Sequence, residues 1–299
     1  MGGQRWKIGI GVAAVTFAAV ANSHPQDVLH THGQSVVPVF EGWDQQPDGS
    51  YDMIFGYLNR NTEENLDVPI GPDNSIEPGG PDQGQPAHFL ARRNRFVFRI
   101  RVPKDFGNKE LVWTLTNSGK TEHAYATLKP GYALSSGQIM ANWRAVGFQL
   151  AGDDANNQPP VIKLEGAVQR TARVGEPLTL KAVITDDGRL KPRVAPNSVP
   201  AEPGPGGRTE APSSPPRYLR AGWLVYRGAQ RVTFQPEQRD PEFRQIGNTA
   251  YPLPPPISSG DTVTAAATFS EPGTVVLRLM AHDGGLSTSQ DVTVAVTPR

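Results

Sequence analysis

The sequence predicts an all-β protein made of two antiparallel β-sandwich domains in tandem. Apolar and polar residues alternate through many short segments, as they do in strands that bury one face. The 31 Gly and 29 Pro residues separate these segments as turns. Only the short stretch 136–143 has the pattern of a helical turn. A length of 299 residues also favours two domains, because single domains are usually shorter.

The first domain is predicted to span residues 36–150. Its clearest strand is "RFVFRIRV", in which Phe96, Phe98, Ile100 and Val102 are expected to face the core together. Two further rows are predicted to face the same core: Met53, Phe55 and Tyr57, and Leu111, Trp113 and Leu115. The segment 122–128 follows an Asn-Ser-Gly turn and is expected to close a hairpin.

A polar linker at 151–160 separates this domain from a second one at 161–299, which carries a Pro/Gly-rich insertion at 189–217. Four apolar rows predict its core: Leu178, Leu180, Ala182 and Ile184; Val263, Ala265, Ala267 and Phe269; Val275, Leu277, Leu279 and Ala281; and Val292, Val294 and Val296. A second Pro-rich loop is predicted at about 235–259.

The segments "NNQPPVI", "VGEPLTLKAVITDDG", "GWLVYRGAQRVTF", "ATFSEPGTVVLRLMAHDGG" and "STSQDVTVAV" resemble the bacterial PKD-like and immunoglobulin-like modules of secreted proteins. The resemblance covers about residues 157–299 and implies a sandwich with Trp223 in its core. The long insertion departs from the family, whose turn there is shorter. The N-terminal half resembles only uncharacterised secreted bacterial proteins. This resemblance does not indicate any particular activity.

The N-terminus has the layout of a secretory signal peptide, predicted at 1–23. Arg5 and Lys7 precede an apolar run at 8–21, which is too short to span a bilayer comfortably. A flexible leader is expected at 24–35. These features predict an exported protein, periplasmic or extracellular, with no stable transmembrane anchor after cleavage.

The composition excludes several kinds of site and partner. The chain has no Cys, so it contains no disulfide, no thiolate zinc site and no Cys nucleophile. Lys and Arg together number 29, as do Asp and Glu, so no net charge favours nucleic acid.

No catalytic residue is assigned from the sequence. A G-x-S-x-G nucleophile elbow and an H-E-x-x-H metal motif are both absent. A pair of carboxylates facing each other across a cleft remains open, because sequence spacing does not exclude it. Ordinary surface acids explain the acidic residues better, and an enzyme of unrecognised type is kept as an alternative.

Calcium is the candidate ion for the second domain, and no other cofactor is expected. Asp186 and Asp187 end one strand, Asp283 ends another, and the resemblance implies that these turns meet at one pole with Asn157. Calcium takes 6–8 oxygen ligands, which carboxylates and carbonyls supply. The preferred interpretation is that Asp-Asp-Gly and Asp-Gly are ordinary turn sequences, and calcium binding is the alternative.

The segment "NSIEPGGPDQGQPAHF", from Asn74 to Phe89, is predicted to be a constrained irregular loop between two strands. Asp82, Gln83, Gln85 and His88 are expected to project from its Pro-Gly frame as a recognition surface. Trp43 and Tyr51 are rings that could stack on a sugar, whereas Trp113 is predicted to be core.

The sequence therefore predicts an exported, non-catalytic binding or scaffold protein of the bacterial envelope or extracellular space. Its PKD/Ig-like module is expected to act as a spacer or as a protein–protein contact. The expected partner is another envelope or secreted protein, or a glycan. A carbohydrate-binding protein is the second reading of the same features.

Overall fold

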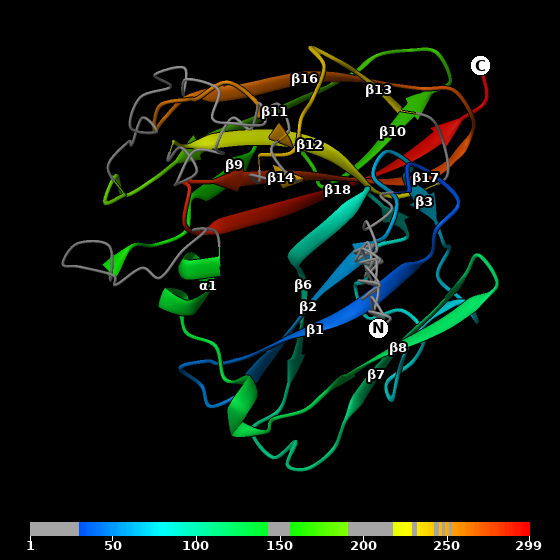
Figure 1. Cartoon of the computed structure of the whole chain (residues 1–299). Coiled ribbons are helices and arrows are strands. Elements are labelled where there is room, and N and C mark those ends of the chain that lie inside the picture. Colours follow the sequence, from blue (N-terminus) through cyan, green and yellow to red (C-terminus); the bar gives the residue numbers. More distant parts are fainter. Residues whose placement is uncertain are drawn as a thin grey trace, which may run out of the picture.

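The fold comes from a computed structural model, which describes residues 30–142, 156–190, 218–228, 232–241, 245–246, 249–250 and 253–299. Strands dominate it, as predicted, and the four-sheet arrangement of two sandwiches is visible in Figure 1. The predicted signal peptide, the last residue of the predicted helical turn (Trp143) and residues 191–217 of the predicted insertion lie outside the described residues. The described residues contain no helix with the length and apolar character needed to cross a bilayer.

The first sandwich packs two three-stranded sheets. One sheet has the order β1-β2-β6, with strands at Val36–Gln45, Tyr51–Asn59 and Arg92–Val102. The other has the order β4-β7-β8, with strands at Asn74–Glu77, Leu111–Asn117 and Lys120–Ala126. Four short elements complete it: β3 (Leu66–Asp67), which pairs with β5 (His88–Phe89), the 3₁₀ helix η1 (Pro130–Tyr132) and α1 (Ser136–Asn142).

Aromatic rings fill the core of this sandwich, and the predicted rows on β2 and β7 are confirmed. Phe55 stacks on Phe98 with ring centroids 5.1 Å apart, and Trp113 meets Phe98 edge-on at 5.0 Å. Trp113 is fully buried. Such offset and edge-to-face pairs are the favoured arrangements of aromatic rings, so this core is held by shape as well as by area.

The predicted row on β6 is wrong at its first residue. Phe98, Ile100 and Val102 are buried in the core of the first sandwich, but Phe96 packs against a different apolar cluster. The register of β2 with β6 shifts between Phe55 and Tyr57, and Phe96 adopts φ 53° there. A bulge of this kind turns a side chain to the other face of its sheet, which alternation alone does not reveal.

The second sandwich has the strand order of an immunoglobulin-like fold. One sheet runs β13-β16-β11-β9, with strands at Val232–Gln235, Thr262–Phe269, Leu178–Thr185 and Val161–Leu164. The other runs β10-β18-β17-β12, with strands at Gln169–Arg173, Ser287–Thr297, Gly273–His282 and Arg220–Arg227. A small hairpin, β14 (Gln245–Ile246) with β15 (Thr249–Ala250), lies where a Pro-rich loop was predicted.

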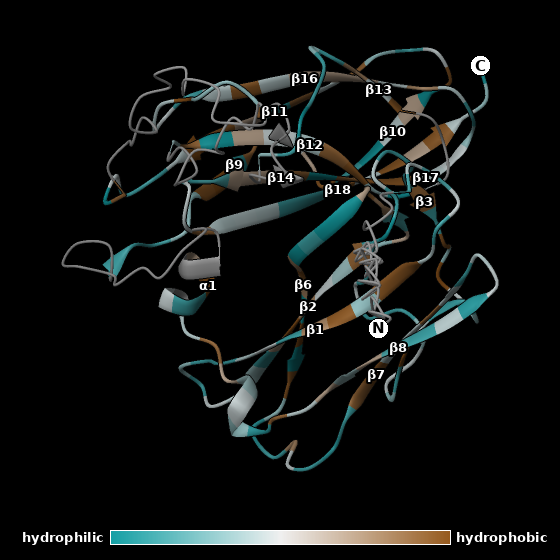
Figure 2. Ribbon diagram, in the orientation of Figure 1, coloured by the Kyte–Doolittle hydropathy of each residue, from teal (hydrophilic) through white to brown (hydrophobic). Residues whose placement is uncertain are grey.

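Both sheets of the second sandwich bury the rows that the sequence predicts. Trp223 is 1% exposed, on the strand where immunoglobulin domains place their core Trp. Among the described strands the prediction of antiparallel sheets is confirmed, except that β10 pairs with β18 in parallel. Figure 2 shows hydrophobic residues concentrated on the strands within each sandwich, whereas the end of β6 that approaches the second sandwich is hydrophilic.

A third apolar cluster lies between the two sandwiches. It joins Ile54 of β2, two residues of α1, Leu190 and Leu286, and all five are buried. Because Ile54 points away from its own core, β2 is buried on both faces. The sheet β1-β2-β6 is thus an inner layer of the molecule, with β17 and β18 on its far side.

Candidate functional site: the interface and cleft between the sandwiches

The segment Asn74–Phe89 forms much of the interface between the two sandwiches. The sequence predicted one irregular loop, but the segment begins with β4 and ends with β5, so the irregular part is shorter. The amide N–H of Ala87 donates to the carbonyl of Tyr226 at 3.1 Å, which brings β5 beside β12. The hydroxyl of Tyr226 donates to the carbonyl of Gly84 at 2.6 Å. The loop therefore lies against the second sandwich.

Asp82 and Gln83 are held within the molecule by charged and amide hydrogen bonds. Arg227 of β12 binds the Asp82 carboxylate through both terminal nitrogens, at 2.8 and 3.0 Å, and this partner lowers the pKa of Asp82. Arg227 also donates to the carbonyl of Gln85 at 2.8 Å. The Gln83 amide donates to three loop carbonyls, at 2.8 to 3.2 Å.

Gln85 and His88 are engaged in the same way. Gln85 is fully buried. Its side-chain nitrogen donates to the carbonyl of Pro81, and its side-chain oxygen accepts the backbone N–H of Gln83. His88 pairs with Asp67 across the β3–β5 ladder, with Nδ1 2.9 Å from the carboxylate. These contacts organise the loop, and the recognition role predicted for its four polar residues stays a prediction.

A buried arginine ties the sandwiches together beside that loop. Arg278 of β17 binds Asp291 of β18 at 2.7 and 2.9 Å, and its third nitrogen donates to the carbonyl of Val97 at 2.6 Å. Its guanidinium carbon lies 3.3 Å from the centroid of the Tyr226 ring. Burial disfavours the charged guanidinium, but Tyr226 and Asp291 outweigh it and hold the pKa of Arg278 above its ordinary value.

Trp43 and Tyr51 lie together at one end of the first sandwich. Their rings meet edge-on at 5.3 Å, and both pack against its core. The indole N–H of Trp43 donates to the carbonyl of Lys129 at 3.0 Å. Neither ring lines the cleft described next, and a sugar-binding role for them stays a prediction.

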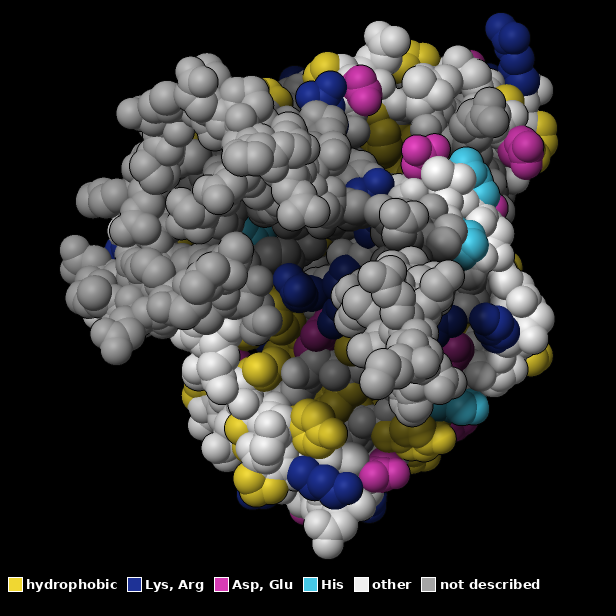
Figure 3. Space-filling view, in the orientation of Figure 1, with side chains coloured by type: hydrophobic (Ala, Val, Ile, Leu, Met, Phe, Trp, Pro, Cys, Tyr) yellow, Lys and Arg dark blue, Asp and Glu magenta, His cyan; other side chains and the backbone are white. Residues whose placement is uncertain are grey.

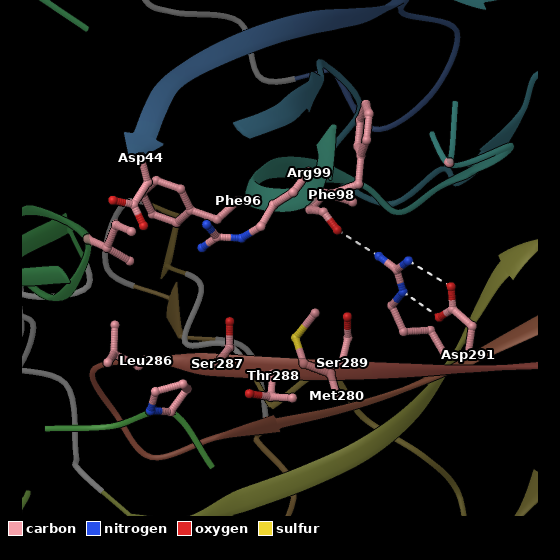
Figure 4. A pocket seen from close by; sticks show the side chains of 15 residues that line it. Asp44, Phe96, Phe98, Arg99, Met280, Leu286, Ser287, Thr288, Ser289 and Asp291 are labelled. Carbon is pink, nitrogen blue, oxygen red and sulfur yellow. Dashed lines mark hydrogen bonds and ion pairs between the residues drawn. The ribbon is translucent and has the colours of Figure 1, made fainter. Parts of the chain in front are cut away.

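A cleft of about 600 Å³ opens between the inner sheets of the two sandwiches. Figure 3 shows Lys and Arg side chains around the hollow between the two halves of the molecule. Strand β6 lines one wall and β18 the other, with the end of β1, α1 and β17 completing it. Figure 4 shows Arg99 reaching into the space, opposite the hydroxyls of Ser287 and Ser289. Concave sites of this volume between domains are where small ligands commonly bind.

The charges of the cleft are balanced. Arg278 and Asp291 neutralise each other at one end. Asp44 lies toward the other, where burial raises its pKa and Arg99 partly offsets that rise. Arg99 also approaches Asp52 at 3.9 Å. The cleft thus offers donors and acceptors without a net charge that would attract an anion or a cation.

A buried carboxylate fixes the bulge that carries Phe96. Glu41 of β1 pairs with Arg93 at 2.7 Å and accepts a hydrogen bond from the Phe96 backbone. A Cβ atom at Gly56 would overlap both Glu41 and the Asn94 carbonyl, so only glycine fits between the bulged strands. Desolvation raises the pKa of Glu41, and Arg93 opposes that rise.

The four residues of the predicted calcium site come from one pole of the second sandwich. The Asn157 amide donates to Asp283 at 2.7 Å, and Asp187 accepts from the backbone of Gln158 at 3.0 Å. Burial raises the pKa of Asp283 to about 6, and the nearby carboxylate of Asp186 adds to that rise. The hairpin β17–β18 closes this pole, since Asp283 also accepts the amides of its own turn.

Two buried oxygens at this pole lack a hydrogen-bond partner among the described residues: Oδ1 of Asn157 and Oδ1 of Asp186. An oxygen-seeking cation would satisfy such atoms. Yet no three His, Asp or Glu side chains in the described ranges approach closely enough to form a metal cluster. Backbone carbonyls or water would have to complete a calcium shell, so calcium stays a prediction.

Sequence reasoning missed Phe96, Arg99, Arg278 and the two serines as site residues. Ser287 and Ser289 alternate on the outward face of β18, in register with His282 and Met280 of β17. The residue on the same face two positions on, Asp291, pairs with Arg278. The sequence signal available for this site was a row of small hydroxyl residues on one face of a strand, followed by an acid that pairs with an arginine. The same pattern is equally typical of a solvent-exposed strand.

Comparisons with known proteins identify no family for this chain. No protein-family model matches the sequence, and no curated protein does. Several solved structures are similar to it, among them the following three. Domains 4 and 5 of the S-layer protein SbsC share 9% identity over 81% of this chain and 85% of that one, with a TM-score of 0.24. The fibronectin(III)-like modules of Clostridium thermocellum CbhA share 11% over 88% and 95%, with a TM-score of 0.23, and the D00-D0 domain of intimin 8% over 87% and 100%, also at 0.23. TM-scores of this size carry no argument about function.

Proposed function

We propose that the chain is an exported binding or scaffold protein without catalytic activity, belonging to the bacterial cell envelope or the extracellular space. The observation that carries this proposal is the interface between the sandwiches. Arg227 with Asp82, Arg278 with Val97, and the buried cluster around Ile54 hold two β-sandwiches as one body. A fixed pair of sandwiches suits a spacer, because it presents its two far ends at a constant separation.

The second sandwich would supply the contact with a partner envelope or secreted protein. Its immunoglobulin-like strand order leaves the sheet β13-β16-β11-β9 facing away from the first sandwich, while the sheet containing β17 is taken up by the interface. The PKD-like sequence segments support the same role by resemblance. The calcium pole would stiffen the turn that precedes β18.

Small-angle scattering on the full chain tests the rigid-spacer part. We expect one compact, salt-independent envelope for the wild type, and a broadened distance distribution for the double variant Arg227→Met with Arg278→Met. Arg173→Met removes an exposed arginine from β10 and serves as the control. A wild type as broad as the double variant would contradict a rigid spacer. Export is tested separately, by cell fractionation and by mass determination of the mature N-terminus.

The partner part needs a matched comparison. Chemical cross-linking in intact cells should join the wild type and Arg173→Met to the same envelope or secreted protein. The double variant should lose most of that product if the partner requires the fixed geometry. Equal cross-linking by all three proteins would show that one sandwich suffices and that the spacer role is wrong.

A further inference from the structure

We propose that the cleft between the sandwiches is a binding site for a neutral saccharide of one or two sugar units. The cleft brings together an aromatic ring, a carboxylate, a guanidinium and two hydroxyls from three strands, β1, β6 and β18. This goes beyond the proposed scaffold role, because it assigns the chain a small ligand. It uses none of the rings or loop residues that the sequence singled out.

The size of the cleft fits such a ligand. Its volume of about 600 Å³ lies within the roughly 300–1,000 Å³ that is usual for small-molecule sites. Both walls are strands held in place by the Arg278 network, so the site is largely formed before a ligand arrives. Binding then costs little ordering of the protein.

The hydrogen-bonding groups match a polyhydroxylated molecule. Ser287 and Ser289 have no side-chain hydrogen bond to any described residue, and Figure 4 shows their hydroxyls directed toward Arg99. Hydroxyls both donate and accept, whereas Asp44 accepts and Arg99 donates. A sugar carries several hydroxyls that do both, so it can satisfy all four side chains at once.

The charge balance selects a neutral ligand over an ionic one. The charged residues that line the cleft are Asp44, Arg99, Arg278 and Asp291, two of each sign. Arg278 and Asp291 are already paired, which leaves one carboxylate and one guanidinium for the ligand. An anion would meet Asp44, and a cation would meet Arg99.

Phe96 supplies the apolar surface that a sugar ring requires. It is the residue that the β6 bulge turns out of the first core, and its φ of 53° lies in the left-handed region that is unfavourable for a residue with a Cβ. Figure 4 places its ring beside Asp44 at one end of the cleft. Strain and bulges of this kind cluster at binding sites, where they aim one side chain.

Titration calorimetry on the full chain tests the proposal, with glucose, galactose, N-acetylglucosamine and their β-1,4-linked disaccharides as probes. We expect at least one probe to bind saturably. Phe96→Gly should raise its Kd by about tenfold or more, because the ring contact is lost. Glycine accepts φ 53° without strain, which offsets part of the packing lost from the third apolar cluster, and a thermal melt checks that the variant is folded.

Two controls separate the site from general effects. Ser118→Gly relieves a similar φ of 50° in the β7–β8 turn, outside the cleft, and should leave the Kd unchanged. The pair Ser287→Ala with Ser289→Ala should weaken binding, whereas Gln290→Ala on the same strand should not. The proposal is overturned if no probe binds at millimolar concentration, if Phe96→Gly binds as well as Ser118→Gly, or if a net-neutral zwitterion such as free serine binds in place of every sugar.

Discussion

The guanidinium of Arg278 and the carboxylate of Asp291 form a two-point ion pair on neighbouring strands, at 2.7 and 2.9 Å, and Arg278 reaches from it to the Val97 carbonyl of the other sandwich. The ion pair lies within one sheet, whereas the hydrogen bond to Val97 crosses from one sandwich to the other. The interface therefore depends on a side chain that its own sheet already positions.

Replacing Arg278 by Met should destabilise the protein by about 2 kcal/mol, because Asp291 loses its partner and the Val97 carbonyl loses its donor. The cost stays moderate since the Asp291 side chain is 40% exposed and water can reach it. Chemical denaturation should show it as a lower midpoint. A variant as stable as Arg173→Met would contradict a structural role for this arginine.

The side chain of Asn74 organises the loop from inside the first sandwich. Its amide donates to the carbonyls of Val68 and Pro86 at 2.9 and 2.8 Å, and its oxygen accepts the indole N–H of Trp113 at 3.0 Å. Asn74→Ala leaves these groups buried without partners, so we expect a loss of about 3 kcal/mol. Thermal unfolding compared with the exposed Asn108→Ala checks this, and equal Tm values would contradict it.

The raised pKa of Glu41 predicts a pH-dependent contribution to stability. An acid whose pKa is higher in the folded than in the unfolded protein binds more protons when folded, so stability falls as pH rises through the folded pKa. Glu41→Gln removes this titration. The stability of the wild type relative to Glu41→Gln should therefore be greatest at acidic pH and decline above the ordinary Glu range.

Denaturation midpoints measured across this pH range give that difference directly. The exposed Glu110→Gln is the control and should show no such trend against the wild type. If the stability of the wild type relative to Glu41→Gln instead grows with pH, then Arg93, and not burial, has the larger effect on the pKa of Glu41.

Calcium should stabilise the second sandwich if the pole with Asn157 and Asp283 binds it. A ligand that binds the folded state alone adds about 2.7 kcal/mol when it is present at 100 times its Kd. Thermal melts in calcium should therefore lie above melts in EGTA, and Asp283→Asn should remove the difference while Asp105→Asn keeps it. If the two melts of the wild type coincide, the calcium site is wrong.

The cores could be predicted from the sequence because burial and strand alternation are local properties. Trp113 and Trp223 lie in rows with period two, and both are buried as expected. Phe96 lies in an equally regular row, but the bulge opposite Gly56 breaks the register, and only the glycine hints at it. The short strand β4 was missed because four residues among Pro and Gly carry too little pattern.

The site could not be predicted in the same way, because its contacts join residues far apart in the chain. Asp82 and Arg227 are 145 positions apart, and Arg278 and Val97 are 181 apart. Each looks like an ordinary surface charge or strand residue alone. The polar density of the loop did mark it as unusual, but it gave no sign that the second sandwich would take up its side chains.

The separation of Asp82 from Arg227 also has a consequence for biogenesis. At about 5–20 residues per second, a ribosome needs roughly 7 to 30 s to add Arg227 after Asp82. During that interval the loop lacks its partners in β12, and Ile54 still lacks Leu286, which is made later than Arg227. The newly made first sandwich is thus the form of this protein that most needs a chaperone, whichever compartment it folds in.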